Sequence, residues 1–297
     1  MVANAASYYA DLTEQYLHYG GDAHGWHYGI WESDVATHAA ALLRSNECLL
    51  RGLDVTPSTR ILDVGFGEGG FSVWAAEHRG AQVTGITVCP EHVALARGLA
   101  ARHGVTARCE FLVMNMDQLG FGPDSFDIVV NQETACYARD KLGYLAGVWR
   151  VLKPGGVWRN LDFSVRHGSF SDAEARSYRD VCDGFHIPSL VSLQALLDLL
   201  ERTGFEVLDG RDMTSEVLPT AAMIRRQCYL PLLMKYLHLD WAVYSREREQ
   251  RNNRQGHVLA AHRYSRGLER GFFRNVYCSA RKPAFGASVP GSSTQPE

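Results

Sequence analysis

The stretch RILDVGFGEGG, residues 60–70, joins a short apolar run to a cluster of glycines. The run at 60–64 is apolar and β-branched, which is typical of a buried strand, and FSVWAAEHRG at 71–80 has the spacing of a helix. Glycines at 65, 67 and 69 have no side chains, so the turn between them lets the backbone approach a ligand closely. Strand, glycine turn and helix therefore form the repeating unit of the predicted fold.

The same unit recurs along the chain. Further strands are predicted at 81–87, 109–113, 126–130, 157–163, 205–209 and 271–280, and helices at 90–104 and 140–152, the second stopped by Lys153-Pro154-Gly155-Gly156. Strands that alternate with helices of about ten to fifteen residues indicate a parallel sheet with helices on both faces. The predicted fold class is α/β, a doubly wound, mostly parallel, seven-stranded sheet.

Composition excludes several functions. The 297 residues are 46% hydrophobic and 21% charged, as in an ordinary globular chain, and 30 Lys and Arg against 33 Asp and Glu leave a net charge of −3. Such a balance provides no broad basic face, so nucleic acid is not an expected partner. Seven cysteines without a C-x-x-C pair predict reduced thiols and a cytoplasmic protein. Residues 227–245 are interrupted by charged residues and a proline, so membrane insertion is not expected.

The glycine turn alone does not decide the ligand. A nicotinamide site would end the second strand with an acid that holds a ribose hydroxyl, whereas this strand ends at Thr87. A P-loop would continue with Gly-Lys-Ser/Thr, which is absent here.

Five motifs occur in one order across residues 61–156: ILDVGFGEGG, VTGITVCPEHV, NMDQLGF, DSFDIVVNQETACYA and RVLKPGG. Together they resemble the class I, Rossmann-like S-adenosylmethionine-dependent methyltransferases. The Gly-Ile-Thr ending of the second strand also resembles the branch that contains cyclopropane and mycolic acid synthases. The resemblance implies S-adenosyl-L-methionine as cofactor. It assigns the methionine part to Asp63, Gly65, Gly67 and Gln132, the ribose to Thr87 and His92, and the adenine wall to Asn115 and Met116.

This resemblance divides the chain into a core and its cover. We predict an N-terminal helical cover at 1–53, the cofactor-binding core at 54–213, a helical lid insertion at 214–270, the final core strand at 271–282 and a disordered tail at 283–297. Open α/β sheets bind ligands beyond the carboxyl ends of their strands, where such covers can enclose a substrate.

The loop after the fourth strand suggests which atom is methylated. Asn131 to Ala138 resembles the glutamate-centred loops of sterol and isoprenoid-diphosphate C-methyltransferases, where an acid and an aromatic four residues later face the alkene. Glu133 and Tyr137 occupy those places. An alkene that attacks the sulfonium methyl becomes a carbocation, which a carboxylate or an aromatic face stabilises.

The aromatic N-terminal stretch supports this reading. Its HYGIWE portion, residues 27–32, resembles the entry segment of small-molecule members, including the geranyl diphosphate C-methyltransferase type. The resemblance makes Tyr28 a candidate cofactor contact and Tyr16 or Tyr19 a candidate pocket wall, and we carry Tyr19 as a catalytic candidate. The alternative is that these aromatics only pack a helix onto the core. The same arm is the candidate contact for a homo-oligomer.

The sequence thus predicts C-methylation of an isoprenoid or prenylated small molecule in secondary metabolism. No carboxylate cluster for Mg²⁺ is evident, and His24 and His27 at i, i+3 are thin evidence for a metal site, so no metal is predicted. This favours a prenyl chain attached to another scaffold, as with the C-methyltransferase of teleocidin biosynthesis. The alternatives are an O- or N-methyltransferase with His167, His186 or Asp162 as base, and a cofactor-binding partner without methyl transfer.

Overall fold

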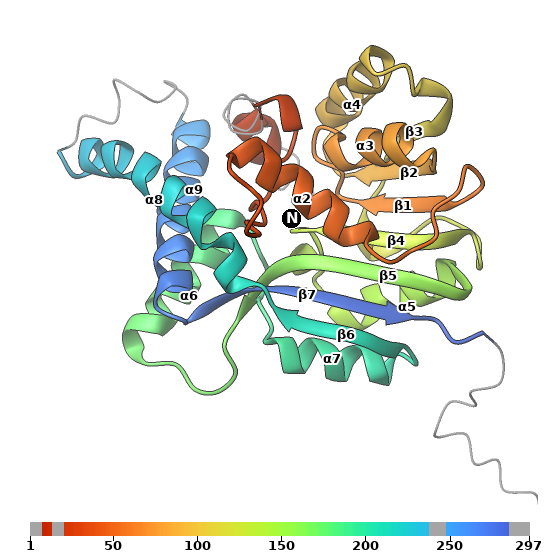
Figure 1. Ribbon diagram of the computed structural model, residues 1–297. Coiled ribbons are helices and arrows are strands. Elements are labelled where there is room, and N and C mark those ends of the chain that lie inside the picture. The colour runs from red at the N-terminus through yellow and green to blue at the C-terminus, as the bar shows by residue number, and fades with distance from the viewer. Residues whose placement is uncertain (1–7, 14–20, 238–247, 285–297) are drawn as a thin grey trace, which may run out of the picture.

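Seven strands form one sheet in the computed structural model, which describes residues 8–13, 21–237 and 248–284 (Figure 1). The strand order is β3-β2-β1-β4-β5-β7-β6. Strands β1 to β5 pair in parallel, and β7 runs antiparallel to both of its neighbours. The predicted doubly wound, mostly parallel sheet is confirmed. The strands are β1 Arg60–Val64, β2 Gln82–Thr87, β3 Cys109–Val113, β4 Phe126–Gln132, β5 Leu152–Val165, β6 Glu206–Asp212 and β7 Phe273–Arg281.

The start of β5 differs from the prediction. The Lys-Pro-Gly-Gly segment at 153–156 was expected to lie before the strand, yet β5 begins at Leu152 and includes it. Phe126 pairs with Leu152 and Ile128 with Val157, so the segment bulges out of the ladder. Gly155 has φ +80°, a conformation that glycine adopts without strain.

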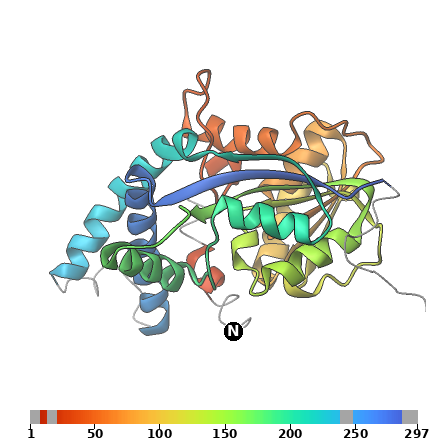
Figure 2. The same cartoon turned by 90° about the horizontal axis from the view of Figure 1, so that it is seen from below.

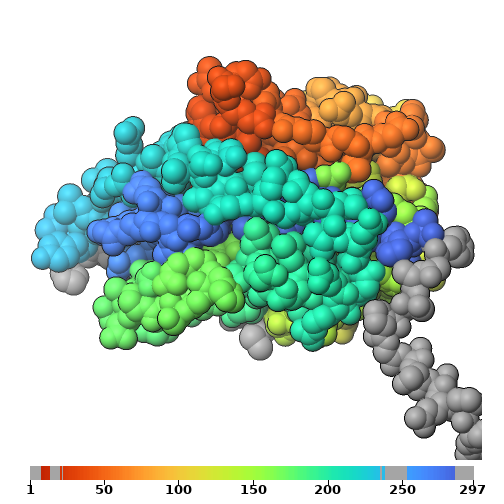
Figure 3. Space-filling view, turned by 60° about the horizontal axis from the view of Figure 1, so that its bottom comes forward, coloured from red at the N-terminus to blue at the C-terminus, as the bar shows by residue number. Residues whose placement is uncertain are grey.

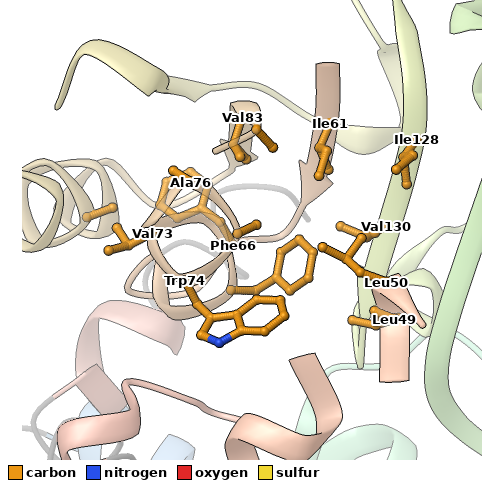
Figure 4. Close-up of a cluster of buried hydrophobic side chains, with 14 of the residues drawn as sticks. Leu49, Leu50, Ile61, Phe66, Val73, Trp74, Ala76, Val83, Ile128 and Val130 are labelled. Atoms are coloured by element: carbon orange, nitrogen blue, oxygen red, sulfur yellow. The ribbon is translucent and has the colours of Figure 1, made fainter. Parts of the chain in front are cut away.

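Helices cover both faces of the sheet. On one face, Ile61, Val83, Ile128 and Val130 of the strands pack against Val73 and Trp74 of α3 and against Leu49 and Leu50 of α2 (Figure 4). On the other face, Trp158 lies in a cluster with side chains of α5 and α7. The helices of these layers are α2 His38–Leu50, α3 Gly70–Arg79, α4 Pro90–Arg102, α5 Lys141–Val151 and α7 Leu193–Arg202. The short helices are η1 Gly21–Ala23, η2 Thr106–Arg108, η3 Met116–Gln118 and η4 Ala135–Tyr137.

A separate group of helices lies at one end of the sheet. It consists of α6 Asp172–Phe185, α8 Thr214–Tyr236 and α9 Arg248–Glu269, with α9 packed against both of the others. Figures 1 and 2 show this group beyond the strand ends, and Figure 3 shows its atoms as one continuous mass. Its buried cluster includes Val181, Phe185, Val217, Ala260 and Tyr264. None of the described helices is long and apolar enough to span a bilayer.

Helices α6 and α9 approach each other most closely at two glycines. A Cβ on Gly184 would lie 2.3 Å from the backbone oxygen of Gly256. Backbone cannot move aside as a flexible side chain can, so a methyl group at Gly184 forces the two helices apart. In contrast, a Cβ on Gly98 of α4 would meet only the end of the Arg102 side chain, at 3.6 Å.

These two glycines give a paired prediction about stability. Gly184→Ala should lower the free energy of unfolding by about 1–3 kcal/mol because it overpacks a helix contact. Gly98→Ala should raise it by about 0.5–1 kcal/mol because alanine favours the helix and meets open space. Urea denaturation of both variants measures these values. Equal effects of the same sign would contradict the close α6–α9 contact.

Candidate active site

A cavity of about 860 Å³ lies between the carboxyl ends of the parallel strands and the group formed by α6, α8 and α9, which is called the helical cover below. Eleven of the twelve residues that the sequence singled out line it: Tyr28, Asp63, Gly65, Gly67, Thr87, His92, Asn115, Met116, Gln132, Glu133 and Tyr137. Tyr19, the twelfth, lies outside the described residues. The strands bring these positions together because the loops that follow β1, β2, β3 and β4 all open at the same edge of the sheet.

The glycine loop after β1 forms one wall of the cavity. Gly65 and Gly67 have φ +84° and +58°, the left-handed region that glycine occupies without strain. A Cβ on Gly65 would lie 2.5 Å from Cγ2 of Thr134, and one on Gly67 would lie 3.7 Å from the Trp26 ring. The requirement for glycine therefore comes from backbone conformation and from protein neighbours, as well as from access to a ligand.

Asp63 is a buried carboxylate at the end of β1. Its side chain is 2% exposed, and Oδ2 accepts a 2.6 Å hydrogen bond from the Ser72 hydroxyl. Burial raises the pKa of Asp63 to about 7, although the Ser72 hydrogen bond acts in the opposite direction. A cationic ligand group in the cavity would favour the ionised form.

The N-terminal segment is fastened to the glycine loop through Glu68. His24 Nδ1 lies 2.9 Å from Glu68 Oε2, and Trp26 Nε1 donates to Glu68 Oε1 at 2.8 Å. Glu68 is 4% exposed, so this pair of contacts is shielded from solvent. Sequence reasoning overlooked Glu68, because nothing in a glycine-rich turn indicates that its acid pairs with residues more than forty positions earlier.

The end of β2 contributes a hydroxyl, and the first turn of α4 contributes a neutral imidazole. Thr87 Oγ1 accepts a 3.2 Å hydrogen bond from the backbone N–H of Cys89, which leaves the hydroxyl proton to donate. His92 is 2% exposed and stands edge-on to Trp26, with ring centroids 4.7 Å apart. Burial lowers the pKa of His92 to about 4, so its imidazole is neutral at physiological pH.

The three other residues predicted to contact the cofactor have partners within the protein. Asn115 caps η3 by accepting from the backbone N–H of Asp117 at 3.0 Å. Gln132 Nε2 donates to Asn46 Oδ1 at 3.2 Å. Met116 packs partly buried against the core cluster on the α5 side of the sheet.

The loop after β4 is tightly fixed. Glu133 has φ +55°, an uncommon conformation for a residue with a side chain, and its N–H donates to Leu161 O at 2.6 Å. Asp162 Oδ2 accepts from the backbone N–H of Cys136 at 2.8 Å, and Lys141 Nζ donates to Cys136 O at 3.1 Å. Strained residues held by surrounding contacts are common at functional sites.

The Glu133 side chain is held by donors from both ends of the chain. Its Oε1 accepts from the backbone N–H of Tyr28 at 2.9 Å and from Asn275 Nδ2 at 3.3 Å. Burial, reinforced by the charge of Asp162, raises the pKa of the Glu133 carboxyl well above its usual range. The hydroxyl of Tyr28 points elsewhere, to Ser265 Oγ at 3.1 Å, so Tyr28 meets Glu133 through its backbone.

The part of the cavity under the helical cover is largely aromatic and apolar. Phe163 and Phe185 line it with stacked rings 5.7 Å apart, and Tyr137 stands edge-on to Tyr9 at 5.9 Å. Sequence reasoning did not single out Phe163 of β5, Phe185 of α6 or His257 of α9, because none of them lies in a motif. His257 also lines this part and hydrogen-bonds the Tyr8 hydroxyl at 2.7 Å.

The alternative bases differ in position. His186 lines the cavity, whereas His167 is exposed outside it. Asp162 is 3% exposed, fixes the loop after β4 and does not line the cavity. Burial raises the pKa of Asp162 to about 6.

The histidines of the entry segment have protein partners. His27 is buried, with Nδ1 3.1 Å from Tyr28 O, and burial lowers the pKa of His27 to about 4. Within residues 8–13, 21–237 and 248–284, no group of three or more His, Cys, Asp or Glu side chains could hold a metal ion.

Comparisons with known proteins identify the family of the chain. Residues 62–158 match the family model described as "Methyltransferase domain". Methyltransferase GfsG of Streptomyces halstedii is 30% identical over 200 residues, 67% of this chain and 72% of that protein. Cycloartenol-C-24-methyltransferase 1 of Oryza sativa subsp. japonica is 27% identical over 215 residues, 70% of this chain but only 60% of that protein. O-methyltransferase cnsE of Penicillium expansum is 29% identical over 66% of this chain and 71% of its own.

Solved structures share the fold at low sequence identity. The [4+2]-cyclase SpnF superposes with a TM-score of 0.73 at 23% identity, over 94% of this chain and 95% of its own. Geranyl diphosphate C-methyltransferase from Streptomyces coelicolor A3(2), solved with Mg²⁺, geranyl diphosphate and S-adenosyl-L-homocysteine, gives 0.67 at 18% identity over 93% and 97%. The glycine loop, the cavity at the strand ends and these matches together establish that the chain belongs to the S-adenosylmethionine-dependent methyltransferases.

Proposed function

We propose that this methyltransferase transfers the methyl group to an alkene carbon of an isoprenoid or prenylated small molecule. The observation that carries the proposal is Glu133, a buried carboxylate that lines the cavity beside aromatic side chains and has no cationic partner among the described residues. Tyr137 lines the same cavity from the same loop.

The proposed reaction needs little from the protein beyond placement and charge. The alkene π electrons form a bond to the methyl carbon, and the carbon–sulfur bond breaks with its electrons going to sulfur, which leaves S-adenosylhomocysteine. The positive charge moves to the more substituted alkene carbon, where Glu133 and the face of Tyr137 stabilise it. The cation then loses a proton or is captured by another bond of the acceptor.

The aromatic lining supports an apolar acceptor. Phe163, Phe185 and Ile224 offer apolar surface to a hydrocarbon chain. Apolar walls around the acceptor limit the access of water to the cation. Sterol C-methyltransferases among the relatives and geranyl diphosphate C-methyltransferases among the structural neighbours carry names that agree with alkene methylation.

We further propose that the acceptor carries its prenyl chain on another scaffold. A diphosphate is bound through positive charge, either from Lys and Arg or from Mg²⁺ held by one or two carboxylates and the phosphates. Among the described residues that line the cavity, Arg139 is the only Lys or Arg.

Methylation of oxygen or nitrogen is the second candidate. His186 lines the cavity and could remove a hydroxyl or amine proton, and O-methyltransferases are among the relatives. In this candidate reaction His186 acts as a base, whereas in the leading one Glu133 stabilises a carbocation.

Glu133→Gln separates the two candidates. We expect turnover to fall by about 10²–10³ because the neutral amide no longer stabilises the developing cation, while S-adenosylmethionine binding stays unchanged. The assay follows label from the cofactor methyl into geranylated indoles. Glu47→Gln, at a half-buried position on α2 where Glu47 pairs with Arg44 and does not line the cavity, is the control. An unchanged rate in Glu133→Gln, with loss of turnover in His186→Gln, would instead support O- or N-methylation.

Asp63 predicts a pH dependence of cofactor binding. We propose that its carboxylate holds the ammonium group of the cofactor, so affinity should rise as pH increases towards about 7, where Asp63 ionises. It should fall again above about 8, where an α-amino group loses its proton. Calorimetry across this range should show a maximum of affinity for the wild type. In Asp63→Asn, binding should be weak, and the affinity should not rise between pH 5 and pH 7. A wild-type affinity that is flat from pH 5 to pH 8 would remove Asp63 from the ammonium site.

A further inference from the structure

Asn275 reaches the loop after β4 from the opposite end of the chain. It lies on β7, where it pairs with Phe163 of β5, and its side chain is 2% exposed. Directly paired residues of neighbouring strands point to the same face of a sheet, so Asn275 lies on the face from which Phe163 enters the cavity. Asn275 itself does not line the cavity but stands behind Glu133.

The β7 backbone around Asn275 is fixed. Its N–H donates to Thr214 Oγ1 at 3.2 Å, and its carbonyl accepts from the N–H of Met213 at 2.8 Å. The backbone from which the Asn275 side chain extends to Glu133 is therefore held in place.

Both donors to Glu133 use one carboxylate oxygen. Tyr28 N–H and Asn275 Nδ2 converge on Oε1, and no described residue donates to Oε2. Since Glu133 lines the cavity, Oε2 is the oxygen left to face a ligand. Two donors on one oxygen also fix the rotation of the carboxylate plane.

The other titratable groups near Glu133 do not favour its charge. The charge of Asp162 of β5 raises the pKa of Glu133. Cys136 of the same loop and Tyr264 of α9 are also buried, and a charge on Glu133 raises the pKa of each of them. The hydrogen bonds from Tyr28 and Asn275 act in the other direction and lower the Glu133 pKa. The Asn275 amide is the side chain that favours the ionised carboxylate.

We infer that Asn275 is a positioning residue that orients Glu133 with Oε2 towards the cavity and stabilises its charged form. Its contribution to turnover rests on the proposed function of Glu133, whereas its effect on the carboxylate does not.

The test is a carbon-13 NMR titration of the Glu133 carboxyl in protein labelled at glutamate and saturated with S-adenosylhomocysteine. The spectrum of Glu133→Gln assigns the signal. In Asn275→Leu, which removes the donor but keeps the volume, we expect the midpoint to rise by about one pH unit, the equivalent of one hydrogen bond to a charged group. In Asn275→Asp, which replaces the donor with a second carboxylate, we expect a larger rise.

Asn160→Leu is the matched control. Asn160 is also a buried sheet asparagine, 1% exposed, but it lies on β5, and its amide atoms have no hydrogen-bond partner among the described residues. Its replacement should leave the Glu133 titration where it is. Melting curves and cofactor calorimetry on all variants report folding separately.

Two outcomes overturn the inference: an unchanged Glu133 midpoint in Asn275→Leu and Asn275→Asp, or an equal shift in Asn160→Leu. A different outcome bears on the proposed function alone. If both Asn275 variants raise the midpoint as expected but Glu133→Gln still methylates prenylated acceptors at the wild-type rate, Asn275 keeps its positioning role and Glu133 loses its catalytic one.

Discussion

The contact between Thr134 and the glycine loop sets the geometry of the whole site. Thr134 Oγ1 donates to Val64 O at 2.5 Å and accepts from Asn131 Nδ2 at 2.8 Å, and its methyl group fills the space that a Cβ on Gly65 would need. The glycine loop and the loop that carries Glu133 therefore rest directly on each other. If the glycine loop holds the cofactor as proposed, this contact fixes how far the reacting methyl group lies from the carboxylate.

The segment from His24 to Tyr28 links the same two loops a second time. Its first part is fastened to the glycine loop through Glu68, and its last part donates the Tyr28 N–H to Glu133. One short segment thus contacts both loops, and its Tyr28 N–H supplies one of the two hydrogen bonds to Glu133. The placement of this segment and the orientation of the Glu133 carboxylate are therefore linked.

The sequence predicted the sheet because apolar runs between glycine and proline turns locate the strands. The residues of the cavity edge came from the resemblance to the methyltransferases, which assigned Asp63, Thr87, Asn115 and Gln132, and parallel pairing brings all four to one edge of the sheet. The bulge at 153–156 escaped prediction, since Lys-Pro-Gly-Gly is equally compatible with a helix stop and with an irregular strand start.

The contacts that tune the site could not be predicted in the same way. Glu68 pairs with His24, and Asn275 with Glu133, across 44 and 142 residues. Such pairs depend on how distant segments of the chain meet, and neither His24 nor Asn275 lies in a motif. The reason for Gly65 also changed: the expected constraint was the cofactor, whereas the nearest obstacle to a side chain is Thr134.

The electrostatics of the acceptor side fit the proposed reaction for a simple reason. Burial makes the charged form of Glu133 costly, and the described residues supply it with hydrogen-bond donors but with no cation. Before the proposed reaction the alkene beside this carboxylate is neutral and the positive charge lies on the cofactor sulfonium; as the methyl group moves, that charge passes to the alkene carbon. An interaction that strengthens only as charge develops lowers the barrier without tightening substrate binding. An arginine or lysine beside Glu133 would neutralise the carboxylate before the reaction, and the carboxylate would then stabilise the developing carbocation less.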